Sequence, residues 1–414
     1  MTGSPKIDRH APRWSELAPL LKIAKQRGNR EQRQVARATN VAELRTLARR
    51  RTPRSVFDYV DGGAGDEIAM SRARGTFDRV EFLPHVLRDV SKVSVKTTLF
   101  GAPIAMPLVF APTGYTRMMR TEGEVAVARV AAKAGIPYSL STVGTTTPED
   151  VAAASGDGRR WFQLYVWRDR ERSLALIQRA ERAGFEALVL TVDVPVTGDR
   201  LRDVRHGLTI PPTLNLRTFI DGALHPRWLF DFLTTPPPVF ASMTEENKSL
   251  EDQAKAMFDA SVAWDDLHWF RKVWPHRLIV KGVQRIDDAV RLPEFGVDGV
   301  VLSNHGGRQL DRAVTPLELL PEVVREVGST LEVMIDTGVR NGADVVAAVA
   351  MGAKAVMVGR PYLYGLMAGG EAGVQRVVDL FKGDVRRTMQ LLGATSIAEL
   401  DPSLVRLRNN GARP

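Results

Sequence analysis

The chain has 414 residues, of which 44% are hydrophobic and 25% charged, and its formal net charge is +9. This composition is typical of a globular protein with a large core, and no apolar run approaches the length of a membrane span. The chain has no cysteine, which excludes disulfides, thiolate catalysis and cysteine-ligated metals, and its seven histidines lack the paired spacing of a zinc site, so we expect no metal.

The N-terminal region does not resemble a signal peptide, because charged residues such as Lys6, Asp8 and Arg13 interrupt it. We therefore expect a cytoplasmic protein. Arginines cluster between Arg45 and Arg54 without the interleaved aromatic residues of a nucleic-acid-binding surface. We expect no nucleic-acid partner and interpret the cluster as a solvated basic face, with an anionic lipid surface as the alternative partner.

Residues 1–100 are expected to form an N-terminal helical segment that packs on the rest of the chain. Within it the pattern predicts one helix from about residue 41 to 59, ended by Gly62 and Gly63.

Eight short apolar runs rich in β-branched residues follow residue 100. They cover residues 107–111, 138–142, 161–166, 187–193, 278–281, 299–303, 332–336 and 355–358. None alternates cleanly with polar residues, which is typical of parallel strands buried on both faces. Helical patterns such as 122–134, 172–183 and 342–350 lie between most of them, as in βα units. The sequence therefore predicts an α/β fold, a (β/α)₈ barrel over residues 101–385, with an open doubly wound sheet as the alternative.

One connection breaks this rhythm, between the fourth and fifth strands. It contains an insertion at about 205–265 with an aromatic stretch at 225–233. Long insertions at the C-terminal face of a barrel are usually lids, interfaces or loops. After the barrel, residues 386–414 are expected to form a C-terminal helical tail.

The C-terminal ends of barrel strands build the active site, and here these ends are unusually polar. His305 and Arg308 follow the sixth strand, three residues apart. An imidazole can take a proton near neutral pH while a guanidinium holds a carboxylate by two hydrogen bonds, so the pair indicates an enzyme acting on a small acid. The alternative for an isolated pair of this kind is a structural histidine beside a solvated arginine.

The other polar residues at the strand ends fall into groups by their chemistry. Asp193 can orient the imidazole of His305 and stabilise its charged form. A second group, Tyr59, Tyr165, Arg200 and Arg308, can hold a carboxylate and a hydroxyl. A third group, Gly338, Arg340, Gly359 and Arg360, falls where barrels bind phosphate. A phosphate site beside an acid site indicates a phosphorylated cofactor.

These motifs resemble those of the FMN-dependent L-2-hydroxy acid dehydrogenases and oxidases. The resemblance extends over nearly the whole chain and is carried by residues 57–59, 111–114, 122–124, 162–165, 191–193, 201–205, 280–282, 303–311, 336–340 and 359–361. The stretch Ser303-Asn304-His305-Gly306-Gly307-Arg308-Gln309 is the most specific of them.

The resemblance implies a role for each matching residue. His305 would be the base and Asp193 its partner, whether the α-hydrogen leaves as hydride or His305 first removes the α-proton. Tyr59, Arg200 and Arg308 would bind the substrate carboxylate and Tyr165 its hydroxyl. Lys281 would stabilise negative charge on the flavin. The remaining cofactor contacts would come from Thr113, Gly114, Ser141, Gln163, Thr191, Asp336, Gly338, Arg340, Gly359 and Arg360.

The chain departs from the short-chain glycolate oxidases at Val143, where they have tryptophan, and at Gly114, where many members have alanine. Both changes are expected to enlarge the pocket. Thr337 replaces a common glycine and is expected to matter little.

The sequence is most similar to bacterial flavin-linked L-lactate dehydrogenases, which implies a small 2-hydroxy acid as substrate, quinone or cytochrome as acceptor and a homotetramer. Residues 225–233, with Trp228, Phe230 and Phe232, are expected to contact the inner face of the cell membrane, or else the barrel or another subunit. The alternatives to this function are an oxygen-using oxidase or monooxygenase, a mandelate-type dehydrogenase and a Schiff-base aldolase acting through Lys281.

Overall fold

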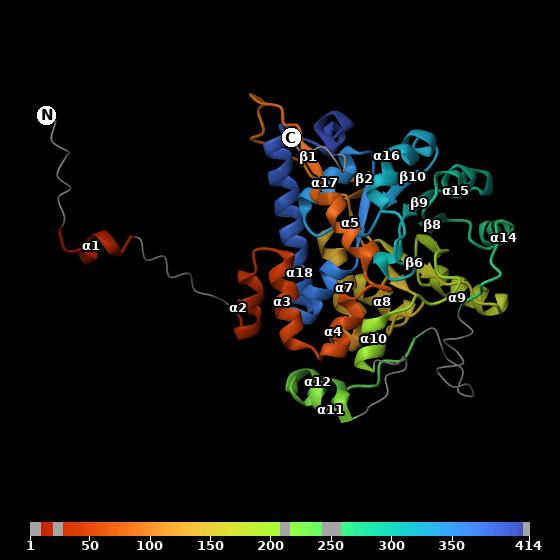
Figure 1. Cartoon of the computed structure of the whole chain (residues 1–414), viewed down its shortest axis with the longest axis horizontal. Coiled ribbons are helices and arrows are strands. Elements are labelled where there is room, and N and C mark those ends of the chain that lie inside the picture. Colours follow the sequence, from red (N-terminus) through yellow and green to blue (C-terminus); the bar gives the residue numbers. More distant parts are fainter. Residues whose placement is uncertain (1–9, 20–27, 208–215, 242–257, 409–414) are drawn as a thin grey trace.

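A closed barrel of eight parallel strands lies at the centre of the molecule (Figure 1). The computed structural model describes residues 10–19, 28–207, 216–241 and 258–408. The barrel strands are β4 (Leu108–Phe110), β5 (Tyr138–Ser141), β6 (Arg160–Leu164), β7 (Ala187–Thr191), β8 (Arg277–Val283), β9 (Gly299–Leu302), β10 (Glu332–Ile335) and β11 (Ala355–Val358). They follow one another around the barrel in chain order, and β11 pairs with β4 to close it. The predicted (β/α)₈ fold is confirmed, and the open sheet is excluded.

Helices follow the strands and cover the outside of the barrel. They are α6 (Thr116–Met119) and α7 (Gly123–Ala134) after β4, α8 (Pro148–Ser155), α9 (Arg170–Arg182), α15 (Ile286–Arg291), α16 (Pro316–Val327), α17 (Gly342–Ala350) and α18 (Arg360–Leu392). Several begin at side-chain caps that satisfy free amide groups: Thr147 accepts from Asp150, Asp169 from Glu171 and Asn341 from Asp344. The local sequence therefore fixes where these helices start.

A hairpin closes the N-terminal end of the barrel. It consists of β2 (Thr97–Leu99) and β3 (Ala102–Ile104), and the ring of Phe100 at its tip packs edge-on against Trp161 at 5.7 Å. A Cβ on Gly299 would lie 2.6 Å from this ring, so only glycine leaves room for the hairpin. With this end filled, the C-terminal end is the one available for a site.

The N-terminal segment contains α1 (Trp14–Leu17), α2 (Arg30–Arg37), α3 (Val41–Arg51), α4 (Arg54–Asp61) and α5 (Ile68–Asp78). The single helix predicted over residues 41–59 is wrong, because the chain leaves the helix at Thr52 and restarts after Pro53. Proline has no amide hydrogen to continue the helical ladder. The break turns α4 so that Tyr59 faces the barrel mouth, while α3 packs along α18 (Figure 1).

The long connection between β7 and β8 carries α10 (Leu201–His206), α11 (Leu216–Ala223), α12 (Pro226–Thr234) and α14 (Asp266–Val273). The α11 and α12 helices lie together at one edge of the molecule (Figure 1).

The end of the described chain returns to the N-terminal segment. Short 3₁₀ turns at Ile397–Glu399 and Pro402–Leu404 lead into β12 (Val405–Leu407), which pairs antiparallel with β1 (Val80–Phe82). The boundary expected at residues 385 and 386 falls inside α18, in the part that follows its kink at Gly369 and Gly370, and part of the expected tail is a strand. The division into an N-terminal segment, a barrel and a tail remains a proposal.

Candidate active site

A cavity of about 630 Å³ opens at the C-terminal ends of the barrel strands. Its size is in the range of small-molecule and cofactor sites. Most of the residues expected from the sequence line it, namely Tyr59, Thr113, Gly114, Ser141, Tyr165, Arg200, Lys281, His305, Arg308, Asp336, Gly338, Arg340, Gly359 and Arg360. Three expected residues do not line it: Gln163 stands beside Ser141 and Thr191 beside Lys281 in the strand register, and Asp193 follows β7.

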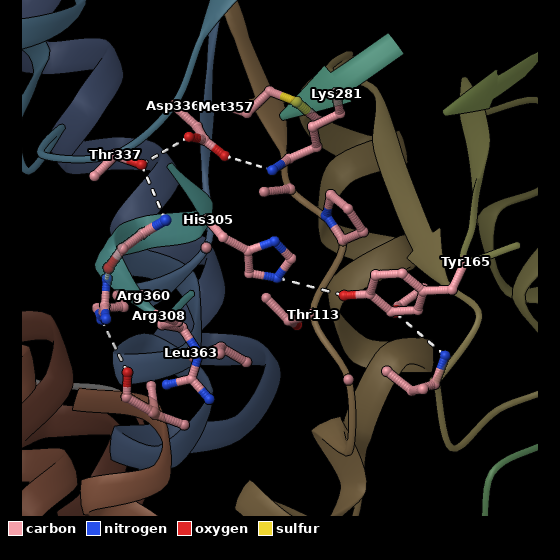
Figure 2. Close-up of a pocket in the computed structure, with 18 of the residues that line it drawn as sticks. Thr113, Tyr165, Lys281, His305, Arg308, Asp336, Thr337, Met357, Arg360 and Leu363 are labelled. Atoms are coloured by element: carbon pink, nitrogen blue, oxygen red, sulfur yellow. Dashed lines mark hydrogen bonds and ion pairs between the residues drawn. The ribbon is translucent and has the colours of Figure 1, made fainter. Parts of the chain in front are cut away.

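His305 and Asp193 form a hydrogen-bonded pair, although they are far apart in the sequence. The Nδ1 atom of His305 lies 3.0 Å from Oδ1 of Asp193. The other ring nitrogen, Nε2, faces the cavity and lies 3.4 Å from the hydroxyl of Tyr165 (Figure 2). The imidazole is therefore oriented by a carboxylate on one side and can exchange a proton on the other.

Asp193 is buried and ionised. Burial raises its pKa, but the nearby charges of His305 and Lys281 outweigh this effect and lower the pKa overall. A Cβ on Gly282 would lie 2.7 Å from the Asp193 side chain, so glycine is needed for this close approach. Gln309 holds the loop after Asp193, since its Nε2 donates to the carbonyl of Val196 at 2.9 Å. Sequence reasoning quoted Gly282 and Gln309 within motifs but gave them no role.

Two arginine guanidiniums lie over the ring of one tyrosine. The Cζ atoms of Arg308 and Arg200 lie 4.9 and 5.8 Å from the ring centroid of Tyr59. No carboxylate of the described residues pairs with either guanidinium, and the buried Nε of Arg200 has no hydrogen-bond partner. Burial and then the charge of Arg200 lower the pKa of Arg308 to about 9. Two crowded cations without a counter-ion make an anion site, and their planar groups match a carboxylate.

Lys281 belongs to a closed ring of hydrogen bonds that includes the His305 loop, and Figure 2 shows the part of it that joins Lys281, Asp336 and Thr337. Its Nζ lies 2.8 Å from Oδ2 of Asp336 and donates to Oγ of Ser303 at 2.9 Å, and the same Oγ accepts from the amide of His305 at 3.0 Å. Thr337 completes the ring: its hydroxyl donates to Asp336 at 2.8 Å and accepts from the amide of Gly306 at 3.0 Å. Thr337 adopts a left-handed φ of 65°. The residue expected to matter little thus connects two strands.

The charge of Lys281 is stabilised by its neighbours. Burial lowers the pKa of Lys281, but Asp336 and Asp193 raise it by more, so the net direction is upward. A protonated amine is not a nucleophile, which argues against the Schiff-base aldolase.

Two buried donors at the barrel mouth have no partner within the described residues. The Oε1 of Gln163 accepts from Ser141 at 2.9 Å, but its Nε2 and the hydroxyl of Thr191 are both unsatisfied. Leaving a buried polar group unpaired costs roughly 1–3 kcal/mol, so these atoms indicate a bound molecule that accepts hydrogen bonds. Thr113 differs, because its hydroxyl already lies 2.6 Å from that of Tyr362.

The side of the cavity formed by the segments after β10 and β11, across the barrel from Gln163 and Thr191 on β6 and β7, contains glycines and arginines. Gly338 has a φ of 93°, and a Cβ there would lie 2.6 Å from the carbonyl oxygen of Ala73. Arg340 also lines this side. Arg360 uses three nitrogens to donate to backbone carbonyls of Val60, Gly306 and Gly62, at 2.9, 2.8 and 2.7 Å. A guanidinium has five N–H groups, so Arg360 keeps donors for an anion while it ties α4 to the His305 loop.

These features fit FMN. The unpaired donors of Gln163 and Thr191 match a ring with several acceptor atoms, and Lys281 matches an edge where negative charge develops. The glycines and arginines after β10 and β11 match a phosphate.

The space at Gly114 is already filled. A Cβ on Gly114 would lie 2.3 Å from Cγ2 of Val143 and 3.1 Å from its carbonyl oxygen. The expectation that the two departures each enlarge the pocket is therefore wrong for Gly114, whose missing side chain makes room for the valine.

Comparison with known proteins agrees with this geometry. The family model described as FMN-dependent dehydrogenase matches residues 48–407. A Mycobacterium tuberculosis protein provisionally named L-lactate dehydrogenase is 52% identical over 96% of both chains. (S)-Mandelate dehydrogenase of Pseudomonas putida is 43% identical over 90% of this chain and 94% of that protein.

Among solved structures, one described as the monotopic membrane protein (S)-mandelate dehydrogenase superposes with a TM-score of 0.87 at 41% identity. It covers 90% of this chain and all of that one. The family match spans every strand of the barrel and every residue of the cavity. The chain therefore belongs to the FMN-dependent dehydrogenase family, and FMN is its cofactor.

Proposed function

We propose that the protein oxidises an L-2-hydroxy acid, with L-lactate as the main candidate, to the 2-oxo acid. The observation that carries the proposal is that the His305–Asp193 pair and the unpaired cations Arg200 and Arg308 face one cavity. Relatives named L-lactate dehydrogenase support it, including one from Allorhizobium ampelinum that is 42% identical over 88% of this chain.

In the proposed reaction the acid loses the hydrogen of its Cα–H bond and the proton of its hydroxyl. Arg200 and Arg308 bind the carboxylate, and the Tyr59 ring, over which both guanidiniums lie, fixes its place. His305 takes the proton at Nε2, and ionised Asp193 stabilises the resulting imidazolium. FMN, when bound, would accept the electron pair of the Cα–H bond together with the hydrogen that His305 does not take.

Two further residues act on charge and orientation. The hydroxyl of Tyr165, which burial keeps protonated by raising its pKa, donates to the substrate oxygen. The ammonium of Lys281 is fixed by Asp336 and stabilises negative charge that develops beside it. The unpaired Nε2 of Gln163 and hydroxyl of Thr191 donate hydrogen bonds to the cofactor.

Anaerobic stopped-flow mixing tests this proposal. We expect L-lactate to bleach the bound flavin in a single turnover and D-lactate to leave it oxidised, with (S)-mandelate as the second acid to compare. A purified holoenzyme that no L-2-hydroxy acid bleaches would contradict the proposal.

We also propose that the electrons pass to quinone or cytochrome at a membrane surface, on the inner face of the cell membrane. The α11 and α12 helices and the turn between them support this, because five of the larger apolar side chains in this region are at least half exposed: Phe219, Ile220, Leu224, Phe230 and Leu233. A related structure is described as a monotopic membrane protein. None of the helices in the described ranges is long and apolar enough to cross a membrane.

The aromatic stretch at 225–233 divides into two faces. Trp228 stacks on Phe232 at 4.9 Å and donates to the carbonyl of Met118 at 2.8 Å, so both rings pack on the barrel side. Phe230 and Leu233 point outward, 65% and 64% exposed. Within this stretch the proposed membrane contact therefore rests on Phe230 and Leu233, whereas the contacts of Trp228 and Phe232 support the alternative expectation of packing on the barrel.

The acceptor separates the dehydrogenase from an oxygen-using oxidase. After anaerobic reduction, the flavin is mixed with a short-chain ubiquinone, cytochrome c or air-saturated buffer. We expect quinone or cytochrome to reoxidise the flavin much faster than oxygen does, and the reverse order would favour the oxidase.

A homotetramer is the proposed assembly, and native mass spectrometry tests it.

A further inference from the structure

One cation of the cavity has no function in the reaction described above. The side chains with a permanent positive charge that line the cavity are Arg168, Arg200, Lys281, Arg308, Arg340 and Arg360, and the lining carboxylate is Asp336. Lys281 and Asp336 pair with each other. Arg200 and Arg308 match the substrate carboxylate, while Arg340 and Arg360 lie at the phosphate side. Arg168 remains, and it has no counter-ion among the residues that the structure describes.

The acids near Arg168 are held by other residues. Asp259 and Asp266 pair with Arg170 at 3.0 and 2.8 Å. Asp169 caps α9 and pairs with Arg172 at 3.3 Å. Within the described part of the chain, Arg168 itself has no hydrogen bond or ion pair. Three arginines thus lie close together in the sequence, and the local carboxylates pair with Arg170 and Arg172 and not with Arg168.

Arg168 also lies on the wrong side of the barrel for the cofactor phosphate. It follows β6, whereas Arg340 and Arg360 follow β10 and β11. In the closed barrel, β4 and β5 separate β6 from β11 on one side, and β7, β8 and β9 separate it from β10 on the other. Arg168 therefore stands across the mouth from the phosphate side, on the same loop as Tyr165.

The wall of the cavity beside Tyr165 is partly apolar. Phe258 packs edge-on against the Tyr165 ring at 5.1 Å, and Val196 and Ala260 also line the cavity. Such a wall suits methylene groups, and the exposed guanidinium at its rim suits an anion at their far end.

From these observations we infer that Arg168 binds a second carboxylate on the side chain of the substrate. The inference rests on the proposed function and specifies its substrate class. The enzyme accepts L-2-hydroxy acids whose side chain carries a second carboxylate. It also accepts monocarboxylic acids, which leave Arg168 unoccupied. The reaction at the α-carbon is the same for both.

Matched pairs of acids test the inference by anaerobic flavin reduction in the holoenzyme. L-malate is compared with L-2-hydroxybutyrate, and L-2-hydroxyglutarate with L-2-hydroxyvalerate, at constant ionic strength. We expect at least one diacid to reduce the flavin as efficiently as its monoacid partner. Arg168→Gln should lower the second-order rate constant for that diacid about fivefold to tenfold and for the monoacids less than twofold.

Two control variants separate binding from general charge effects. Arg168→Lys keeps the charge and should retain part of the diacid rate. Arg387→Gln removes an equal charge from α18, at a residue that does not line the cavity, and should change neither rate. An equal loss for both acid classes in Arg168→Gln, or diacids that fail in the wild type while L-lactate reacts, would overturn the inference. If no acid reduced the flavin, L-lactate included, the proposed function would be overturned with it.

Discussion

His305 is held at several points, which explains how a loop residue can have a defined orientation. Its ring is oriented by Asp193, its amide donates to Ser303, and its backbone adopts a φ of 59°. A non-glycine residue in this region is strained and persists only where the surroundings hold it. The surrounding hydrogen bonds therefore keep Nε2 aimed into the cavity.

His305→Gln tests the proposed base directly. The variant should keep FMN, because His305 holds none of the unpaired donors that match the ring, but flavin reduction by L-lactate should slow by about 10²–10⁴-fold, the usual contribution of a positioned base. Stopped-flow bleaching measures the rate, and the visible spectrum gives the FMN content. Near-normal bleaching would assign the base to another residue.

Gly114 and Val143 form one packing unit, and a double-mutant cycle can detect it. Gly114→Ala alone should destabilise the protein by about 1–3 kcal/mol and slow flavin reduction, because the new methyl group forces Val143 to move. Adding Val143→Ala should recover most of both losses. Thermal melts and stopped-flow rates of the two single variants and the double variant give the coupling. Additive effects would mean that the two residues act independently.

At the scale of elements, the barrel could be predicted and several details could not. Strands such as β7 and β11 are continuous apolar runs, and their order along the chain dictates the barrel. The break at Pro53 was readable from the sequence, since proline ends a helix, but the apolar periodicity on both sides concealed it.

The sequence could predict which residues make up the site, but not the hydrogen bonds that join them. Parallel strands bring their ends together, so Lys281, His305 and Asp336 were expected at one mouth. The hydroxyl bonds of Thr337 depend on a left-handed backbone that no sequence pattern gives for threonine. The two faces of α12 likewise depend on where the helix packs, which is a tertiary property.

The outward face of α12 is the element to test for membrane contact. Burying an apolar side chain of this size contributes roughly 1.5–3 kcal/mol, so Phe230→Ser with Leu233→Ser should release the protein from anionic liposomes. Flavin reduction by L-lactate should stay within twofold, because both residues lie outside the cavity. Co-sedimentation measures binding.

A matched control replaces two other exposed apolar residues, Leu391→Ser with Val290→Ser, which are 72% and 46% exposed on α18 and α15. This variant should still bind. Equal loss in both double variants, or no binding by the wild type, would remove the membrane contact from the proposal.

Arg360 begins α18 and joins three parts of the site. Arg360→Ala should weaken FMN retention more than substrate affinity, since it removes a cation from the phosphate side and the hydrogen bonds to Val60, Gly62 and Gly306. Dialysis followed by the flavin-to-protein absorbance ratio measures retention. A variant that keeps a full complement of FMN through dialysis would show that other groups hold the phosphate.

At the scale of the whole molecule, bound FMN is expected to stabilise the folded state against unfolding. Removing FMN leaves the donors of Gln163 and Thr191 unpaired and the cations of the cavity without their anion. Free FMN at about 100 times its dissociation constant should stabilise the native state by about 2.7 kcal/mol. Calorimetry of the apoprotein with and without FMN should show the increase in Tm. An unchanged Tm at saturating FMN would mean that the donors bind something else.

The ring of hydrogen bonds through Lys281, Asp336, Thr337 and the His305 loop has a consequence for protein engineering. Its members come from β8 and from the segments that follow β9 and β10, so the loop and its support are not contiguous in the chain. Transplanting residues 303–311 into another barrel would carry the histidine without the lysine, aspartate and threonine that fix its backbone. A graft that works has to move the ends of all three strands together, so this catalytic loop can be transferred only with the three neighbouring strands β8, β9 and β10.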